Sequence, residues 1–486
     1  AVRRHLDHAY ATNPRQVHQV PWVHHLDPNR VIAGMSRLGA WERRFRAILE
    51  HLVSPDRGRP RDALFVDQPL ALARAGRSAG STLTLTTLLR PWVEDRRFPV
   101  VLEATPEAWV RLEELDRAFT DLFHVEHVAA PPRDRALAQI LSQVEDIERS
   151  SLCTLTLSAL RRVVELQDRF PAARGMPGGV IDRLEALAAR NPETEIDAAR
   201  VDATFQATSG LRPELVDPRA PLPDAALRTR VSTRLVGQPA AVDAIAELVH
   251  VLHAGLVRPG RPLAAWLLVG PTGVGKTEAA KVLAAQLFTT PELVRVDMNE
   301  YADPGAVSRL LGEGGVEGHL TARLRGRTVA VLLLDEVEKA HPSVHDLLLQ
   351  VLDEGRLTDA SGRVLDLSRV AVLLTSNVGA AEVARGAGFE RGQSAREAGF
   401  RAAVERTFRP ELVNRLDRVL VFRSLELADV RRVAGLQLER VLAREGLLRR
   451  TALLDVEPAA LDRLAEAGFD PDLGARALKR LLEDRL

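Results

Sequence analysis

The residues with the clearest chemical potential form a glycine-rich stretch that ends in a lysine and a threonine. In chain order they are Gly270, Pro271, Thr272, Gly273, Val274, Gly275, Lys276 and Thr277. Glycines let backbone amides turn toward phosphate oxygens, the lysine can reach the β and γ phosphates, and the threonine hydroxyl can ligate Mg²⁺. An apolar run at 265–269 precedes the stretch and a helical pattern follows at 278–288. This strand-loop-helix order predicts a nucleotide-binding loop rather than an incidental glycine-rich turn.

Two acidic residues, Asp335 and Glu336, follow the apolar run 329–334. One carboxylate at the end of a strand can hold the Mg²⁺ shell, and a second can polarise the water that attacks phosphorus. We therefore assign Asp335 and Thr277 to the metal and Glu336 to the general base. Acidic residues at a strand end can also be ordinary solvated groups, but the phosphate-binding loop upstream favours the catalytic interpretation.

The elements that must position these residues alternate along the second half of the chain. Strand-like runs such as 329–334 and 370–374 are separated by amphipathic helical stretches such as 278–288. This alternation predicts an α/β fold in which a parallel sheet is buried between helices. From about Ser424 onward the pattern is purely helical, which predicts a small helical domain after the sheet.

Composition restricts the class of protein. A chain of 486 residues predicts two to four domains. Lys+Arg and Asp+Glu both total 66, so the basic excess of a nucleic-acid-binding protein is missing. Cys153 is the single cysteine, no apolar run approaches the ~18 residues of a membrane span, and the N-terminus lacks a signal-peptide core. We expect a cytoplasmic protein with no nucleic-acid and no membrane partner.

Two longer segments extend the motif around the acidic pair: LLDEVEKAHP at 333–342 and LLQVLDEGRLTD at 348–359. They resemble the second ATPase module of the ClpA, ClpB and ClpC chaperones, which are AAA+ proteins, and the resemblance runs from about Thr233 to the C-terminus. It implies tandem AAA+ modules, each a P-loop-type parallel sheet flanked by helices and followed by a small helical lid domain. It also implies ATP hydrolysis with Mg²⁺ to remodel protein substrates.

The same resemblance implies roles for five further residues. Val236 and Gly237 would lie against the adenine. Asn377 matches sensor 1, an amide that feels the γ phosphate and orients the water. Arg415 matches the arginine finger, which reaches the nucleotide of a neighbouring subunit and therefore requires an oligomer, here expected to be a homo-hexamer. Arg476 matches sensor 2, which couples the lid to the nucleotide. Lone arginines on helices are usually solvated, so both arginine roles depend on the resemblance.

The first half of the chain, from about Val31 to Arg190, resembles the first ATPase module of the same chaperones more weakly. The segments that carry this resemblance are 31–34, 41–45 and 64–67. No glycine-rich loop with a lysine precedes Val31. The resemblance therefore implies a structural module there, without catalytic residues.

Substitutions at the expected catalytic positions of the first half support this interpretation. Gln68 stands where the family has its catalytic glutamate, and an amide cannot accept a proton from water. Asp121 and Leu122 stand at the positions of the paired arginine fingers, and 176–179 reads Met-Pro-Gly-Gly at sensor 2. A fragment that begins after its phosphate loop is the alternative, but truncation alone does not explain these substitutions.

Together these patterns predict five segments. They are a degenerate AAA+ large domain at 1–130, its helical small domain at 131–195, a linker rich in proline and glycine at 196–232, an active P-loop ATPase domain at 233–424 and a helical lid domain at 425–486.

The interval 308–320, where the resemblance implies an aromatic pore loop that grips polypeptide, contains no tyrosine, and Arg37 replaces the tyrosine of the first half. Glycine and glutamate cannot provide the apolar contact of an aromatic ring. Two functions therefore remain open: a Clp-type chaperone that remodels proteins, and a nucleotide-switched assembly or regulatory protein that threads nothing. Neutral charge disfavours DNA remodelling. The segment 387–389 is a weak version of a peptidase-docking loop, so peptidase docking is not expected.

Overall fold

A computed structural model describes most of the 486-residue chain. The described residues are 23–32, 39–53, 62–76, 83–171, 174–313, 316–359, 364–382, 393–442, 456–468 and 477–478. They fall into two compact units, one up to Ala129 and one from Ala130 onward, and each is described by itself. Within this described part, no helix combines the length and the apolarity that crossing a membrane requires.

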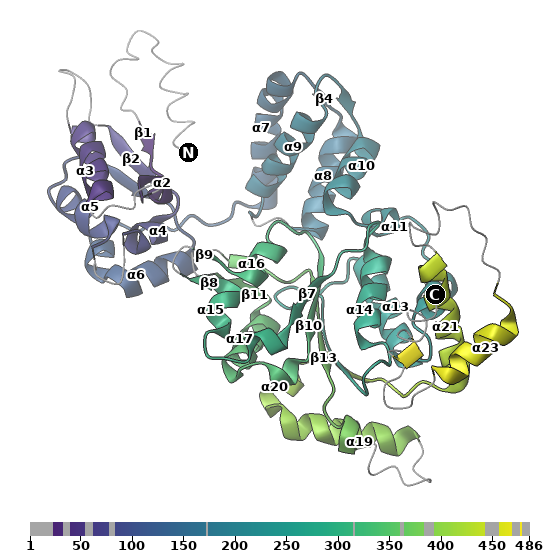
Figure 1. The fold of residues 1–486 in the computed structure, drawn as a ribbon. Coiled ribbons are helices and arrows are strands. Elements are labelled where there is room, and N and C mark those ends of the chain that lie inside the picture. Colours follow the sequence, from purple (N-terminus) through teal and green to yellow (C-terminus); the bar gives the residue numbers. More distant parts are fainter. Residues whose placement is uncertain are drawn as a thin grey trace. The chain divides into compact units, whose positions relative to one another are not determined.

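A five-stranded parallel sheet forms the centre of the second unit, with strand order β14-β6-β13-β10-β7 (Figure 1). The strands are β6 (Ala264–Val269), β7 (Val294–Asp297), β10 (Ala330–Asp335), β13 (Val370–Ser376) and β14 (Arg418–Val421). Trp266 packs into one hydrophobic cluster and its neighbour Leu267 into another, because successive side chains of a strand point to opposite faces. Both faces of the sheet are therefore buried, which explains the continuous apolar runs of β6, β10 and β13.

Helices cover both faces of this sheet. Helices α13 (Pro239–His253) and α14 (Lys276–Leu287) contribute to the cluster that contains Trp266. The cluster on the other face takes side chains from α15 (Ala306–Leu311), α16 (His319–Leu324), α17 (Pro342–Glu354), α19 (Gln393–Thr407) and α20 (Pro410–Arg415). The α/β fold with a parallel sheet flanked by helices, predicted from the alternating pattern, is confirmed.

Short elements complete the second unit. They are η2 (Met298–Tyr301), η3 (Val337–Lys339), the antiparallel pair β8 (Gly312–Glu313) and β9 (Val316–Glu317), and the antiparallel pair β11 (Arg356–Thr358) and β12 (Val364–Asp366). After the sheet, α21 (Leu427–Leu442) and α23 (Pro458–Ala467) pack on each other around a small cluster that includes Val430 and Ala465. The chain is thus helical where the sequence pattern predicts it.

The second unit begins with helices that pack on the same cluster as α13 and α14. They are α7 (Arg133–Ser151), α8 (Leu157–Arg169), α9 (Gly178–Arg190) and α10 (Ala198–Ser209), with the parallel pair β4 (Thr154–Leu155) and β5 (Glu195–Ile196). Ile140 and Leu166 belong to that cluster together with Trp266. The helices and the sheet therefore share one hydrophobic core.

The residues predicted as a linker, 196–232, are helical and packed instead. Helices α10, α11 (Pro213–Val216) and α12 (Asp224–Arg234) occupy most of this segment, and Phe205, Leu215 and Leu227 are buried. Two of the four prolines in this segment, Pro213 and Pro223, lie at helix starts, where a missing N–H costs nothing. Pro213 opens α11 in this way.

The first unit contains a three-stranded parallel sheet of order β1-β2-β3. Its elements are β1 (Val23–His25), α2 (Pro28–Ile32), α3 (Ala40–Val53), β2 (Ala63–Val66), α4 (Pro69–Arg74), α5 (Leu85–Glu94), β3 (Val100–Leu102) and α6 (Pro106–Thr120). Phe45, Leu64, Leu85 and Phe119 are fully enclosed in its core. The weaker alternating pattern of the first half thus corresponds to a genuine sheet with helices.

Candidate functional site

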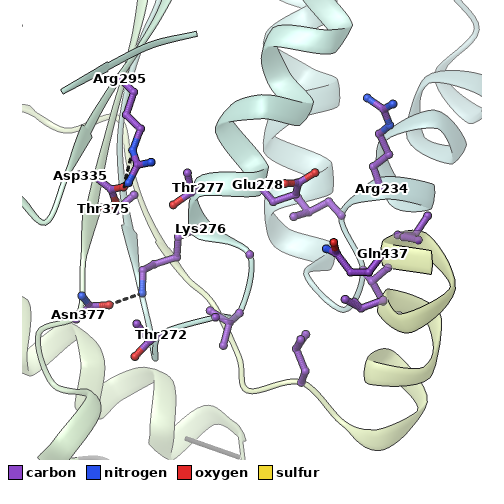
Figure 2. Close-up of a pocket in the computed structure, with 18 of the residues that line it drawn as sticks. Arg234, Thr272, Lys276, Thr277, Glu278, Arg295, Asp335, Thr375, Asn377 and Gln437 are labelled. Atoms are coloured by element: carbon purple, nitrogen blue, oxygen red, sulfur yellow. Dashed lines mark hydrogen bonds and ion pairs between the residues drawn. The ribbon is translucent and has the colours of Figure 1, made fainter. Parts of the chain in front are cut away.

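A cavity of about 360 Å³ opens at the carboxyl ends of the strands in the second unit (Figure 2). Its walls comprise the glycine-rich loop from Thr272 to Thr277, the ends of β7, β10 and β13, the end of α12 and residues of α21. Ligands of open α/β sheets bind at this edge, because loops at the carboxyl ends of parallel strands surround a common crevice. The fold therefore gathers the residues predicted from the sequence around one hollow.

The glycine-rich loop connects β6 to α14 through conformations that larger residues resist. Gly270 has φ +154, and a Cβ atom there would come within 2.5 Å of the backbone oxygen of Phe422. Gly275 has φ +107 and immediately precedes Lys276, the first residue of α14. The loop thus ends at a helix N-terminus, where free amides and the helix dipole favour a phosphate group.

Lys276 is 8% exposed and its ammonium group is held in a fixed place. Nζ donates to the backbone oxygens of Gly270 at 2.5 Å and Pro271 at 2.7 Å, and to Oδ1 of Asn377 at 2.8 Å. These three acceptors are neutral groups that orient the ammonium. The lysine therefore presents a preorganised positive charge to the cavity.

Asp335, the last residue of β10, is almost fully buried and has partners on both carboxylate oxygens. Its Oδ1 accepts a hydrogen bond from the hydroxyl of Thr375. Its Oδ2 accepts from Nη2 of Arg295 at 2.7 Å and from Nε of Arg295 at 3.1 Å. The carboxylate is therefore fixed at the rim of the cavity, opposite the loop that carries Thr277 (Figure 2).

Glu336 follows in a left-handed backbone conformation, with φ +57 and ψ +52. This conformation is costly for a residue other than glycine, and such strain is concentrated at functional sites. The amide of Glu336 donates to Oγ1 of Thr375 at 3.0 Å. Oε1 accepts from Nδ2 of Asn377 at 3.3 Å and Oε2 accepts from Nδ2 of Asn299 at 2.9 Å. The turn thus aims the carboxylate into the cavity, and two side-chain amides hold it.

Asn377 connects the two charged groups of the site. It accepts from Lys276 and donates to Glu336, and its backbone amide donates to Oε1 of Glu338 at 3.0 Å. The predicted loop lysine, acidic pair and strand-end asparagine are therefore brought together. Arg295 and Asn299 were not predicted. The available signal was their place on β7 and η2, because β7 is the strand next to β10 and ends at the same edge.

Part of the cavity lining is apolar. Leu235, Val236, Leu425, Val433 and Leu436 line the cavity beside the polar residues Arg234, Gln437 and Arg440. An apolar surface together with cationic groups matches a nucleotide, whose base is flat and apolar and whose phosphates are anionic. The predicted contact residue Val236 therefore lies in the wall of the cavity.

Gly237 lies beside this wall and not in it. A Cβ atom on Gly237 would come within 2.8 Å of Oδ2 of Asp429 in α21. The next residue, Gln238, donates to the backbone oxygens of Val274 at 3.1 Å and Arg423 at 3.0 Å. This segment therefore fixes the approach of the C-terminal helices to the phosphate-binding loop.

Arg415 lies apart from the cavity of its own chain. It ends α20, forms an ion pair with Asp353 and donates from Nη1 to the backbone oxygen of Glu411 at 3.2 Å. The hydrogen bond to Asp353 raises the pKa of the guanidinium above its ordinary value. Arg415 is not among the residues that line the cavity. Arg476 lies outside the described residues.

The first unit has no comparable arrangement among its described residues. Gln68 precedes α4 without capping it, and Pro69 is buried at the first helical position. Asp121 ends α6 and is followed by Leu122 in a turn. Arg37 lies outside the described residues, as do residues 387–389 of the predicted docking loop. Among the described positions, Gln68, Asp121 and Leu122 offer no cationic side chain to a phosphate group.

Comparisons with known proteins identify families and relatives that this chain is similar to. The family described as AAA domain (Cdc48 subfamily) matches residues 261–419, and the family described as C-terminal, D2-small domain, of ClpB protein matches residues 425–486. A ClpA homolog protein from Fuscovulum blasticum is 35% identical over 481 residues, which cover 95% of this chain and 59% of that protein. The chain belongs to the Clp ATPase family. The resemblance found in the sequence is thereby confirmed.

Other Clp relatives match different shares of the chain. Chaperone protein ClpB 1 from Parasynechococcus marenigrum is 45% identical over 262 residues, 52% of this chain and 30% of that protein. A structure of Saccharomyces cerevisiae Hsp104 with casein, in an extended conformation, has a TM-score of 0.64 at 28% identity and covers 96% of this chain and 81% of that one. This Clp chain thus spans less than two thirds of the curated relatives named here.

The segment 308–320 of this Clp chain contains the antiparallel pair β8–β9, and α16 begins after it. Residues 308–320 include no tyrosine, phenylalanine or tryptophan. His319 begins α16, and its Nδ1 lies 2.8 Å from the hydroxyl of buried Tyr301. The histidine is therefore tied to η2 and packs edge-on against the ring of Tyr301.

Proposed function

We propose that this chain binds ATP with Mg²⁺ in the cavity of the second unit, hydrolyses it there, and uses the hydrolysis to remodel protein substrates. The observation that carries the proposal is the side chain of Asn377, which contacts both Lys276 and Glu336. A single side-chain amide therefore contacts both the phosphate-binding cation and the proton-accepting carboxylate. Phosphoryl transfer needs this placement, because positioning and charge stabilisation supply most of its catalysis.

The residues at the cationic end fit a nucleotide and its metal. The loop amides and Lys276 would hold the phosphates, and Thr277 and Asp335 would hold Mg²⁺. Hydroxyl and carboxylate oxygens are the ligands that Mg²⁺ prefers, and both side chains line the cavity. Bound Mg²⁺ supplies neutralisation of the charge that develops on the phosphate oxygens. Glu336 accepts the proton of the attacking water. Asn377 fixes the position of the Glu336 carboxylate relative to the Lys276 ammonium.

The proposed active state is a homo-oligomer, a hexamer as in the Clp resemblance. Arg415 lies apart from its own cavity and pairs with Asp353, whose side chain is 38% exposed. An arginine at the subunit surface can complete the charge stabilisation of a neighbour's site. Arg476 is proposed as the lid residue that responds to nucleotide. The domain boundaries predicted from the sequence, apart from the linker, are kept in this proposal, as is a cytoplasmic location.

Protein substrates are proposed from the relatives. The Hsp104 structure is a complex with casein, and the ClpB relative is described as a chaperone. The balanced charge of this chain suits a protein partner better than nucleic acid. The proposal includes neither a membrane partner nor a docked peptidase.

A nucleotide-switched assembly or regulatory protein is the second candidate function. The observation that favours it is the segment 308–320, which contains no tyrosine, phenylalanine or tryptophan that could grip a polypeptide. In that case the same ATP site would change the shape of the oligomer without threading a substrate.

One paired measurement tests the main proposal against this alternative. ATP turnover and the unfolding of a tagged model protein are followed in the same reaction, with a non-hydrolysable ATP analogue as the control. The chaperone proposal predicts turnover together with substrate unfolding, because hydrolysis performs the work. Turnover without unfolding would favour the switch, and the absence of turnover would refute both.

The proposed division of labour predicts one bound nucleotide per chain. The first unit offers Gln68 and Pro69 where a catalytic carboxylate would follow the strand. Equilibrium titration with labelled ADP, at protein concentrations well above the dissociation constant, gives the stoichiometry directly. Two equivalents per chain would show that the first unit retains a site. A Lys276→Ala chain should retain none.

A further inference from the structure

Strand β7, which lies beside β10, carries an arginine that forms an ion pair with Asp335. Arg295 belongs to β7, which pairs with β10 in parallel register, with Leu333 opposite Arg295 and Asp335 opposite Asp297. Its side chain runs along the sheet edge to Asp335 and lines the cavity (Figure 2). An arginine therefore lies at the carboxylate that is proposed to hold Mg²⁺.

The contact between Arg295 and Asp335 is highly directional. Nε and Nη2 both donate to Oδ2, while the hydroxyl of Thr375 donates to Oδ1. Asp335 is buried, whereas the Arg295 side chain is 54% exposed and faces the cavity. The carboxylate is thus fixed, and its arginine partner has room to move.

The backbone under Arg295 is anchored separately. The backbone oxygen of Arg295 accepts from Nη1 of Arg323 in α16 at 2.7 Å. Farther along the segment, Tyr301 is buried and bonded to His319. Movement of the guanidinium therefore does not require movement of β7.

We propose that Arg295 is an exchangeable countercharge for Asp335: Mg²⁺ and the guanidinium take turns on this carboxylate. The inference rests on the proposed nucleotide site. When Arg295 holds Asp335, the site can accept a polyphosphate without a second carboxylate repelling it. When Mg²⁺ takes Asp335, the guanidinium is released toward the cavity. Arg295 is a positioning residue in this scheme, because it acts through Asp335.

The charges at the site decide the expected effect. Without Arg295, a metal-free polyphosphate would face Asp335 and Glu336 with one cation fewer beside them, and like charges at short range repel strongly in a partly buried cavity. With Mg²⁺ bound, the metal replaces the lost countercharge. Removal of Arg295 should therefore weaken nucleotide binding in chelator and leave it nearly unchanged in excess Mg²⁺.

The test is equilibrium binding of a fluorescent ADP to Arg295→Gln, titrated in EDTA and in excess Mg²⁺. We expect the affinity in EDTA to fall by about tenfold or more, with a change below about threefold in Mg²⁺. The Mg²⁺ concentration that restores half of the binding should also fall, since the metal no longer competes with a guanidinium. Arg295→Lys retains the charge and should keep most of the binding in EDTA.

The matched control is Arg418→Gln. Arg418 lies on β14, at the opposite edge of the sheet, and its partly exposed side chain forms an ion pair with Glu247. Its loss should alter neither titration. Lys276→Ala should abolish binding in both conditions, and binding that survives this change would refute the nucleotide site itself and not merely the role of Arg295.

Two results would overturn the exchange. An equal loss of affinity in EDTA and in Mg²⁺ would make Arg295 a direct nucleotide contact, and unchanged affinity in both would make the ion pair a bystander. Thermal melting identifies a variant that fails to fold. If Arg295→Gln fails to fold, Arg295→Lys tests the exchange instead. The proposal requires that Arg295→Lys bind the nucleotide in EDTA, and loss of that binding would refute it.

Discussion

ATP hydrolysis by the Glu336→Gln chain should be about 10²- to 10⁴-fold slower than by the unaltered chain. The amide has the same size as the carboxylate but cannot accept a proton from water. The two side-chain amides that hold Glu336, from Asn299 and Asn377, favour an oxygen at each of its two positions. Glutamine offers one oxygen, so one of these hydrogen bonds must also rearrange.

Nucleotide affinity separates this loss from misfolding. Glu336 is expected to act on water, so labelled ADP should bind the variant within about threefold of the unaltered chain. Single-turnover hydrolysis and equilibrium binding are measured on the same preparation, with Glu300→Gln as a control at an exposed acid on η2. Hydrolysis within threefold of normal would show that another group is the base.

The second large effect is expected at Arg415. Replacing it by alanine should lower hydrolysis by about 10³-fold or more, the usual contribution of an arginine that stabilises the transferring phosphoryl group. Binding of ADP to the altered chain should persist, because Arg415 is no part of its own cavity. Arg409→Ala is the matched control, since this arginine begins the same helical segment and is paired with exposed Asp346.

Mixing two inactive chains tests whether Arg415 acts across a subunit interface. An Arg415→Ala chain keeps its own Glu336, and a Glu336→Gln chain keeps Arg415. A mixed oligomer therefore contains interfaces at which both groups are intact, so hydrolysis should reappear on mixing. A mixture no more active than its separate components would mean that Arg415 does not serve its neighbour.

The sequence predicted the parts of the site that are continuous in the chain. The loop at 270–277 and the pair Asp335–Glu336 each follow an apolar strand, and parallel strands bring such ends together without further information. Both are local patterns whose geometry is set by the sheet. Asn377, the residue directly after β13, was identified through the resemblance to the Clp chaperones.

Residues that act through tertiary contacts were harder to find. Arg295 on β7 and Asn299 on η2 reach the site because β7 pairs with β10. No spacing in the sequence shows that these two strands are neighbours. The linker prediction was wrong because proline marks both a loop and a helix start, and only the burial of residues such as Phe205 distinguishes them. Leu436, one of the apolar residues that line the cavity, lies some 160 residues beyond the phosphate-binding loop, so no local pattern connects the two.

The two walls of the cavity belong to parts of the chain with unequal cores. The sheet has a large hydrophobic cluster on each face, whereas α21 and α23 share only a small one. Across the cavity, Arg440 of α21 forms an ion pair with Glu278 of α14 at 2.5 Å. A ligand that touches both walls adds its binding free energy to the association of α21 with the sheet. Local unfolding of α21 is thus thermodynamically linked to nucleotide binding, and the hydrogen-exchange rates of its amides provide a direct gauge of site occupancy.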